Sequence, residues 1–453
     1  MNEVIQKAQH YEVEIIDMGE GGEGIGKIQD FTVFVPNVLV GDQVEICLTK
    51  VKKNYGFGKL VRIITPSIYR IEVRCDKEAI CGGCQFQSLD YQKQLEWKRQ
   101  KVENCLKRIG KLENIEVEPT LGMGTPYHYR NKAQYPIRLV DGKVEIGFFE
   151  AKSKKVVPVT DCLIQHPINK KIIECVKDFL NEYKISIYDD VTHKGLVRHL
   201  MIKTGYKAQD VMVCLVINGK TMPHSKAFVE CLQAISEIKS IVLNHHTDKT
   251  PVILGKECTV LYGSETITEQ IGELKFKVSP LAFFQVNPSQ TEVLYQKALE
   301  YAELSGDEIV WDAYCGIGSI SLFLAQKAKK VYGVEIIPEA IENARENAKL
   351  NDLNNTEFYA GKAEEVIPDL YKQGIIADTI VVDPPRKGCD EKLLETLKAM
   401  VPQRIVYVSC DPATLARDLA YLTKEAGYQV EKVQPVDMFP HTSHVECIVS
   451  LKK

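Results

Sequence analysis

The feature of this sequence that most constrains its fold is a regular alternation of strand and helix patterns after about residue 290. Such alternation predicts a mainly parallel sheet with helices on both faces, because parallel strands need long, usually helical, crossover connections. Ligands of such sheets bind beyond the carboxyl ends of the strands. We therefore expect an α/β domain with its site at that edge. The expected strands are 309–314, 331–335, 379–383 and 404–409, with a terminal pair near Val433 and from Cys447 to Leu451.

The first 65 or so residues follow a different pattern, in which short β-like runs alternate with glycine-rich turns. This pattern predicts a small β-barrel. Within it, residues 49–59 interleave basic and aromatic side chains, a mixture that can neutralise phosphates and stack on bases. A solvated hairpin with aromatic anchors explains the stretch equally well. The expected strands are 11–16, 31–35, 43–48 and 59–62.

The region between these two mixes strands with a few helices and predicts an α+β unit. A charged, leucine-containing pattern indicates a helix over 90–109. Strands are expected at 132–137, 200–203 and 210–217. At 453 residues, the chain is long enough for several domains, each with its own core.

Overall charge and targeting signals restrict the partners of the chain. A formal net charge of −4 provides no broad basic surface, so any nucleic-acid contact must be local. The sequence lacks a run of about 18 apolar residues, and its N-terminus lacks a signal-peptide pattern. We therefore expect a cytoplasmic protein that binds no membrane.

Cysteine usage fits the same compartment. In a chain with no export signal, 14 cysteines indicate reduced thiols, metal ligands or catalysis rather than a disulfide framework. Most are expected to be small core residues, among them Cys105, Cys175, Cys214 and Cys231.

A glycine turn follows the first strand of the alternating region, in Cys315-Gly316-Ile317-Gly318-Ser319. Glycines there let the chain turn sharply and bring backbone close to a ligand. Glu335 ends the next strand, where a carboxylate can accept both hydroxyls of a ribose. NAD remains an alternative ligand, although Ser321 stands where the dinucleotide fingerprint has a third glycine. The turn therefore predicts a nucleoside cofactor.

Reactive side chains follow two later strands. Asp383-Pro384-Pro385-Arg386-Lys387-Gly388 is a stiff turn that fixes a carboxylate at the ligand edge, although a plain turn with exposed basic residues would read the same. Cys410 ends another strand, and a buried structural cysteine is the alternative to a nucleophile there. Glu446 begins the final strand, where the alternative is an exposed acid.

Five motifs together resemble the RNA uracil-5-methyltransferases of the RumA and TrmA type. They are the Cys-Gly-x-Gly turn, Phe283-Phe284-Gln285-Val286-Asn287, the Asp-Pro-Pro-Arg-Lys-Gly turn, Val408-Ser409-Cys410, and Phe439-Pro440 with His444-Val445-Glu446. The resemblance extends over nearly the whole chain. It implies a Rossmann-like class I methyltransferase domain over 281–453. It also implies two RNA-binding units, an OB-like TRAM barrel over 1–65 and a central α+β domain over 66–280.

The resemblance also implies roles for individual residues. In that family, the Ser-Cys cysteine adds to C6 of uracil and the His-Val-Glu glutamate removes the C5 proton, roles that fall on Cys410 and Glu446. The pair suits the chemistry, because C5 is a weak nucleophile until a thiolate adds to C6. S-adenosylmethionine would contact Gln285, Tyr314, Glu335 and Asp383, and Phe283 would stack on the base. The expected RNA contacts on the barrel are Lys52, Lys53, Tyr55 and Phe57.

Three further cysteines are crowded together in Cys75-x5-Cys81-Gly82-Gly83-Cys84. Four thiolates would suit either tetrahedral zinc or a four-iron cluster, and unliganded thiols in a loop are the third reading. The resemblance implies Cys162 as the fourth ligand and a [4Fe–4S] cluster as the metal centre.

Together these features predict a monomeric, S-adenosylmethionine-dependent RNA (uracil-5-)-methyltransferase. The barrel and the cysteine group favour 23S rRNA as the substrate, with tRNA as the alternative. An NAD-dependent oxidoreductase is a second hypothesis, which the missing third glycine disfavours. A catalytically silent iron–sulfur protein that binds RNA is a third, which the complete set of reactive residues disfavours.

Overall fold

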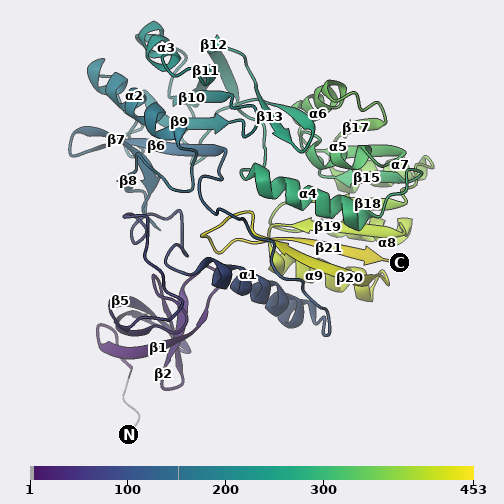
Figure 1. Ribbon diagram of the computed structural model, residues 1–453, viewed down its shortest axis with the longest axis horizontal. Coiled ribbons are helices and arrows are strands. Elements are labelled where there is room, and N and C mark those ends of the chain that lie inside the picture. Colours follow the sequence, from purple (N-terminus) through teal and green to yellow (C-terminus); the bar gives the residue numbers. More distant parts are fainter. Residues whose placement is uncertain (1–4, 152) are drawn as a thin grey trace.

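In the computed structural model, residues 5–151 and 153–453 are described, and they form a closed barrel, two seven-stranded sheets and a two-stranded hairpin. The barrel lies at one end of the molecule, apart from the two large sheets (Figure 1). None of the helices in these residues is both long and apolar enough to cross a membrane.

The N-terminal barrel closes in the strand order β1-β2-β3-β5-β4, which confirms the predicted barrel. Alternate residues of its strands point inward, as the period of a strand requires, and Val13, Val33, Val44 and Ile46 form much of its core. Closure removes the unpaired edges that a five-stranded sheet would otherwise expose. The strands are β1 His10–Met18, β2 Gly24–Ile28, β3 Phe31–Val35, β4 Gln43–Val51 and β5 Tyr55–Thr65.

The central sheet has the order β12-β11-β10-β9-β6-β7-β8 and confirms the predicted α+β unit. Every residue of β9 and β10 is buried, because both faces of the sheet are covered. Helices α2 and α3 pack on one face (Figure 1). The bounds are β6 Lys132–Val140, β7 Lys143–Phe149, β8 Val156–Pro158, α2 Ile168–Glu182, β9 Val197–Thr204, β10 Val211–Ile217, α3 Ser225–Gln233, β11 Ile238–His245 and β12 Glu257–Gly263.

The other face of the central sheet shares a core with the C-terminal region. Met201 and Met212 pack in one cluster with Phe276 of the hairpin and with Phe284 and Leu294 beyond it. The two large sheets are therefore joined by buried apolar surface. The hairpin consists of β13 Ile267–Ile271 and β14 Leu274–Val278.

The C-terminal sheet has the order β17-β16-β15-β18-β19-β21-β20 and confirms the predicted α/β domain. Its first five strands are parallel, and β21 and β20 are antiparallel additions at one end. Separate apolar cores lie on its two faces, under helices from both sides. The bounds are α4 Pro288–Ala302, β15 Ile309–Ala313, α5 Ser319–Ala325, β16 Lys330–Glu335, α6 Pro338–Leu350, β17 Thr356–Ala360, α7 Ala363–Lys372, β18 Thr379–Val382, α8 Glu391–Met400, β19 Arg404–Ser409, α9 Pro412–Lys424, β20 Gln429–Val436 and β21 Glu446–Lys452.

Helix α1, Tyr91–Cys105, connects the barrel side of the molecule to the C-terminal sheet (Figure 1). Its N-terminus is capped by Asp90, whose carboxylate accepts a hydrogen bond from the backbone of Lys93. It continues as a π-helical turn over Leu106–Gly110, so the predicted helix 90–109 is confirmed. The helix packs beside α9 and beneath the loop that precedes β21.

One cysteine pair differs from the expectation of reduced thiols. Cys175 on α2 and Cys231 on α3 form a disulfide, with their Cα atoms 6.6 Å apart. The two helices lie side by side on the central sheet, and this brings together residues that are 56 positions apart in sequence. The sequence pattern of each helix, taken alone, indicated only an apolar face.

Candidate active site

Four parallel strands of the C-terminal sheet end at one edge, and β15, β16, β18 and β19 pair there in register. Strand β21 runs antiparallel to β19, with Cys447 opposite Ser409. Glu446 therefore begins its strand beside the point where β19 ends. The residues that the four parallel strands place at this edge are Tyr314, Glu335, Asp383 and Cys410.

The turn after β15 has the shape of a nucleoside site. Gly316 has φ +54°, and a Cβ added there would meet no atom within 4 Å, so backbone is open to a ligand. The Glu335 carboxylate accepts hydrogen bonds from the backbone of Gly316 at 3.3 Å and of Ile337 at 3.0 Å. Ile336 and Ile337 beside it are 57% and 53% exposed and offer an apolar surface to a base. These residues fit the ribose and adenine of S-adenosylmethionine.

The first turn of helix α5 holds Ser321, which stands where the dinucleotide fingerprint has its third glycine. The Ser321 hydroxyl donates to the Asp312 carboxylate at 2.5 Å, and both residues are buried. The bond ties helix α5 to strand β15, which a glycine at this position could not do. Tyr314, between Asp312 and the turn, has φ +120°, a strained conformation for a residue with a side chain.

Cys410, Glu446 and Asp383 lie close enough at the sheet edge to shift one another's pKa values. Burial, assisted by the nearby Asp383 carboxylate, raises the pKa of Glu446 to about 8. Burial likewise raises the pKa of Asp383 to about 7, assisted by Asp312. The pKa of the Cys410 thiol rises to about 12, through burial first and then through Glu446 and Asp383. The arrangement places a buried carboxyl group beside a thiol, a pair suited to a nucleophile and a proton acceptor.

Arg386 is a site residue that the sequence interpretation missed. Its guanidinium lowers the pKa of both Cys410 and Glu446, so its charge acts against the rise in pKa that the neighbouring carboxylates cause. Its turn is held on helix α9, where the Thr414 hydroxyl donates to the Arg386 carbonyl at 3.1 Å. The sequence showed the basic residue, but an exposed turn gave no sign that its charge acts on the site.

Phe283 and Gln285 lie on a segment that is held in place by Asn131 and by the hairpin. The Asn131 amide donates to the Gln285 carbonyl at 3.1 Å, and Phe284 packs inward with its ring centroid 5.6 Å from that of Phe276. Phe283 itself is 67% exposed. Its ring is therefore available to stack on a base.

The loop between β20 and β21 is held by helix α1. Lys98 donates to the Asp437 carboxylate at 2.5 Å, and both side chains are fully buried. The Gln94 side chain accepts from the backbone of His441 at 3.0 Å. No local signal marked these α1 residues, because their partners lie more than 300 positions away.

The four sequence-predicted cluster cysteines come together from separate segments. Burial raises the pKa of Cys84 to about 12, and smaller contributions to this rise come from Cys162, Cys81 and Cys75. Burial also raises the pKa of Cys162 to about 11, with added contributions from Cys81 and Cys75. Within residues 5–151 and 153–453, however, no three His, Cys, Asp or Glu side chains are close enough to hold a single metal ion. The thiols thus share a region but do not form a ready single-ion site.

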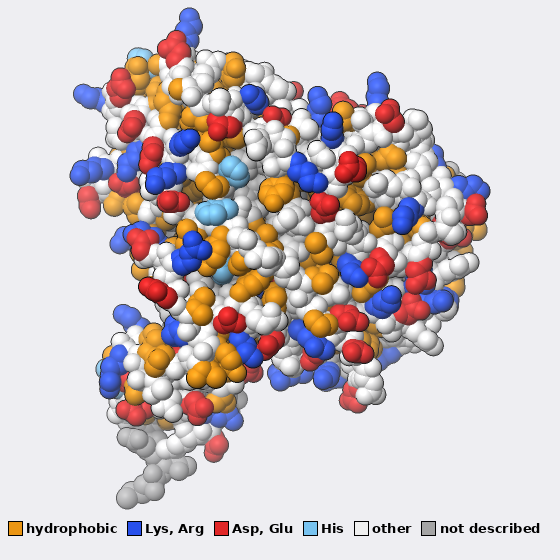
Figure 2. All heavy atoms as spheres, in the orientation of Figure 1, with side chains coloured by type: hydrophobic (Ala, Val, Ile, Leu, Met, Phe, Trp, Pro, Cys, Tyr) orange, Lys and Arg blue, Asp and Glu red, His pale blue; other side chains and the backbone are white. Residues whose placement is uncertain are grey.

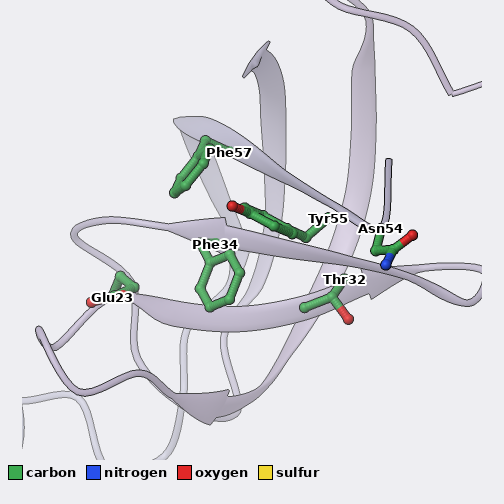
Figure 3. Close-up of a pocket in the computed structure, with 6 residues that line it drawn as sticks. All are labelled: Glu23, Thr32, Phe34, Asn54, Tyr55 and Phe57. Atoms are coloured by element: carbon green, nitrogen blue, oxygen red, sulfur yellow. The ribbon is translucent and has the colours of Figure 1, made fainter. Parts of the chain in front are cut away.

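The barrel carries a separate aromatic pocket of about 470 Å³ (Figure 3). The rings of Phe34, Tyr55 and Phe57 have centroids 5.7 to 5.8 Å apart, and the last two rings are partly exposed. Lys52 and Lys53 lie in the exposed turn just before Tyr55. Figure 2 shows hydrophobic side chains gathered on this end of the molecule, with acidic and basic side chains interspersed. The pocket offers faces on which a planar base can stack.

Comparison with known proteins covers both of the regions that carry these sites. Residues 90–453 match the family described as tRNA (uracil-5-)-methyltransferases, and residues 6–61 match the TRAM domain. An uncharacterized RNA methyltransferase of Clostridium tetani is 52% identical over 446 residues, 98% of this chain and 96% of that protein. A Bacillus cereus protein of the same description is 50% identical over 453 residues, 100% of this chain and 99% of that protein.

A solved structure supports the same fold. The Pyrococcus abyssi tRNA (uracil-54, C5)-methyltransferase, in complex with S-adenosyl-L-homocysteine, superposes with a TM-score of 0.78 at 28% identity. The match covers 97% of this chain and 100% of that one.

The electrostatics of the site predict how fast Cys410 reacts with iodoacetamide. Arg386→Gln should slow alkylation of Cys410, because it removes the charge that lowers the thiol pKa. Glu446→Gln should accelerate alkylation above about pH 8, where the wild-type Glu446 carboxyl group is ionised and raises that pKa. One unit of pKa changes the thiolate fraction about tenfold.

The measurement follows the Cys410 peptide by mass spectrometry at pH 9. Lys387→Gln, at the exposed neighbouring position, is the matched control and should react as the wild type does. Equal rates for the Arg386 and Glu446 variants would contradict the electrostatic arrangement described above.

Proposed function

The chain belongs to the tRNA (uracil-5-)-methyltransferase family, which includes the RumA and TrmA type, and from this membership we propose that it methylates C5 of a uridine through a covalent Cys410 adduct. It is an S-adenosylmethionine-dependent RNA methyltransferase of the uracil-5 class. The observation that carries the proposed mechanism is the thiol and the buried carboxyl group that share the sheet edge, beside the open turn at Gly316.

In the proposed reaction, the Cys410 thiolate bonds to C6 of uracil and the C5–C6 electron pair becomes an enolate. Arg386 favours the thiolate because its charge lowers the thiol pKa. S-adenosylmethionine supplies the electrophilic methyl group that C5 acquires. Glu446 then takes the C5 proton, the C5–C6 double bond forms again, and the thiolate leaves C6. A pKa of about 8 suits Glu446 to this step, because it lies near the working pH.

The cofactor contacts follow from the same edge. We assign the ribose hydroxyls to Glu335, whose carboxylate already faces the glycine turn. Tyr314, Gln285 and Asp383 complete the proposed S-adenosylmethionine set, since they lie on the turn, on the fixed segment and at the end of β18. Phe283, exposed on its segment, would stack on the target base.

The RNA must present its uridine unpaired or flipped outward, because C5 cannot reach the site from within a stack. Flipping costs a few kcal/mol, so contacts elsewhere on the RNA have to offset it. We assign this role to the barrel, with Tyr55 and Phe57 as stacking residues and Lys52 and Lys53 as phosphate contacts.

We propose 23S rRNA as the substrate, because the barrel and the gathered cysteines occur here in one chain. tRNA is the second candidate, and the name of the matching family and the tRNA substrate of the Pyrococcus abyssi enzyme favour it. Both candidates use the same site.

We further propose that Cys75, Cys81, Cys84 and Cys162 hold a [4Fe–4S] cluster. The support is that all four thiols act on one another electrostatically. A four-iron core is larger than a single ion and keeps its ligand sulfurs farther apart than zinc does. A four-iron cluster is held by four cysteine thiolates, which is the number of thiols gathered here.

Two substitutions at the sheet edge should give different defects. Cys410→Ala should abolish methylation and leave S-adenosylmethionine binding intact, because the thiol acts on the base. Glu446→Gln should accumulate a methylated, denaturant-stable protein–RNA adduct, because addition and methyl transfer precede proton removal. Radiolabelled methyl transfer and denaturing gels measure both effects. Cys258→Ala, on β12, serves as the control cysteine. Turnover by Cys410→Ala at the wild-type rate would remove Cys410 from the mechanism.

Mapping 5-methyluridine in ribosomal and transfer RNA from a deletion strain should identify the substrate. We expect one or more sites in 23S rRNA to lose the modification and to regain it when the wild-type gene, but not the Cys410→Ala gene, is returned. Loss confined to tRNA would establish the second candidate instead. Unchanged 5-methyluridine in both RNAs would contradict the proposed activity.

The cluster proposal predicts a brown protein after purification without air, with iron and sulfide in about equal amounts. Cys162→Ser should lose the colour, because it removes one of four ligands. Cys47→Ser, on barrel strand β4, should keep it. A colourless protein with stoichiometric zinc and no sulfide would contradict the cluster, and an unchanged cluster in Cys162→Ser would contradict the choice of fourth ligand.

A further inference from the structure

We propose that Lys101 is a positioning residue, which ties the β1–β2 turn of the barrel to the loop that precedes Glu446 and so holds the catalytic base in place. The inference rests on the proposed function, because it concerns the step assigned to Glu446. It adds a residue that neither the motifs nor the site geometry at the sheet edge identifies.

The Lys101 ammonium joins two backbone carbonyls from distant parts of the chain. It donates to Ser443 at 3.0 Å and to Glu20 at 3.2 Å. Ser443 lies three residues before Glu446, and Glu20 lies in the barrel turn between β1 and β2. The Trp97 ring, with its centroid 5.3 Å from the ammonium, supports the side chain from the same helix. One side chain therefore links the barrel to the loop before β21.

The same barrel turn touches the loop by a second route. Gly22 has φ +85°, and a Cβ there would lie 2.9 Å from Cβ of Gln85. The backbones of Gln85 and Phe86 both donate to the carbonyl of His441, at 2.9 and 3.0 Å. The turn thus packs on the segment that holds the middle of the loop, while Lys101 holds its end.

The turn also reaches the aromatic pocket of the barrel, because Glu23 is one of the residues that line it (Figure 3). Burial lowers the pKa of Lys101, and the nearby Glu20, Asp411 and Glu23 carboxylates act against that shift. A partly buried lysine that donates to two carbonyls fixes the positions of both backbone segments. RNA bound in the pocket would therefore contact the same turn that Lys101 ties to the loop before Glu446.

Loss of this link should affect one step of the reaction. Cys410 is anchored at the end of β19, and the glycine turn is anchored at the end of β15, so addition and methyl transfer do not depend on Lys101. Proton removal does, because Glu446 begins a strand directly after the loop that Lys101 holds. A displacement of about 1 Å at a reacting group can lower a rate roughly 10²-fold.

The test compares Lys101→Met, Lys101→Arg and Lys93→Met in the full-length protein, with total RNA from the deletion strain as the substrate. Lys101→Met should lower kcat by roughly 10- to 100-fold, leave KM within about twofold, and accumulate the methylated adduct expected for Glu446→Gln. Lys101→Arg should restore turnover, because a guanidinium can donate to both carbonyls. Lys93, a surface lysine of the same helix that pairs with Glu96, is the matched control and should behave as the wild type does.

The outcomes separate the inference from the function on which it rests. If Glu446→Gln accumulates the adduct but Lys101→Met does not, or if Lys101→Met loses activity only in proportion to a lower melting temperature, Lys101 is merely structural. If Glu446→Gln turns over fully without an adduct, the base assignment itself is wrong. Adduct in both variants, with rescue by Lys101→Arg, establishes the positioning role.

Discussion

The ion pair between Lys98 and Asp437 is the interaction on which the catalytic edge of this protein depends. Both side chains are fully buried, and removing two charges from water costs several kcal/mol per ion unless close geometry and further hydrogen bonds offset it. Here the Asp437 carboxylate also accepts from Tyr91 at 2.8 Å, and Lys98 also donates to the Phe439 carbonyl at 3.0 Å. The loop before Glu446 can therefore adopt its form only when helix α1 is in place. The C-terminal sheet does not complete its own active site, although it carries every proposed catalytic residue.

The buried carboxyl groups of the candidate active site lower the stability of the fold. Asp312, Asp383 and Glu446 all have raised pKa values, because burial penalises their charged forms. A carboxyl group whose pKa is higher in the folded state than in the unfolded state destabilises the fold as the pH rises above its unfolded value of about 4. The strained backbone at Tyr314 adds to that cost. Carboxyl groups with raised pKa values are expected at an active site that binds a cationic cofactor and needs a proton acceptor, because both tasks use their charge.

Much of this fold and site could be predicted from the sequence, since both follow from local patterns. Short β-like runs between glycine turns indicated the barrel, and the alternation of strand and helix patterns indicated the parallel sheet. The strand ends placed Glu335, Asp383 and Cys410 at one edge. What could not be predicted depends on contacts between distant segments. The effect of Arg386 on Cys410 requires its turn to be packed on α9, and the Cys175–Cys231 disulfide requires two helices to lie side by side. Neither arrangement leaves a signal in the residues near it.

Two separate contact regions, the barrel and the sheet edge, would let a protein with a net negative charge bind RNA. With a net charge of −4, the chain as a whole repels phosphate, so affinity must come from a few local contacts. Aromatic stacking suits this situation, because it needs no net charge and acts on an unpaired base of any kind. A barrel that stacks one part of the RNA and an edge that accepts a flipped uridine would share the cost of distorting the substrate. The β1–β2 turn and Lys101 lie between these two places, and a rigid link there would align the two contacts with the base that completes the reaction.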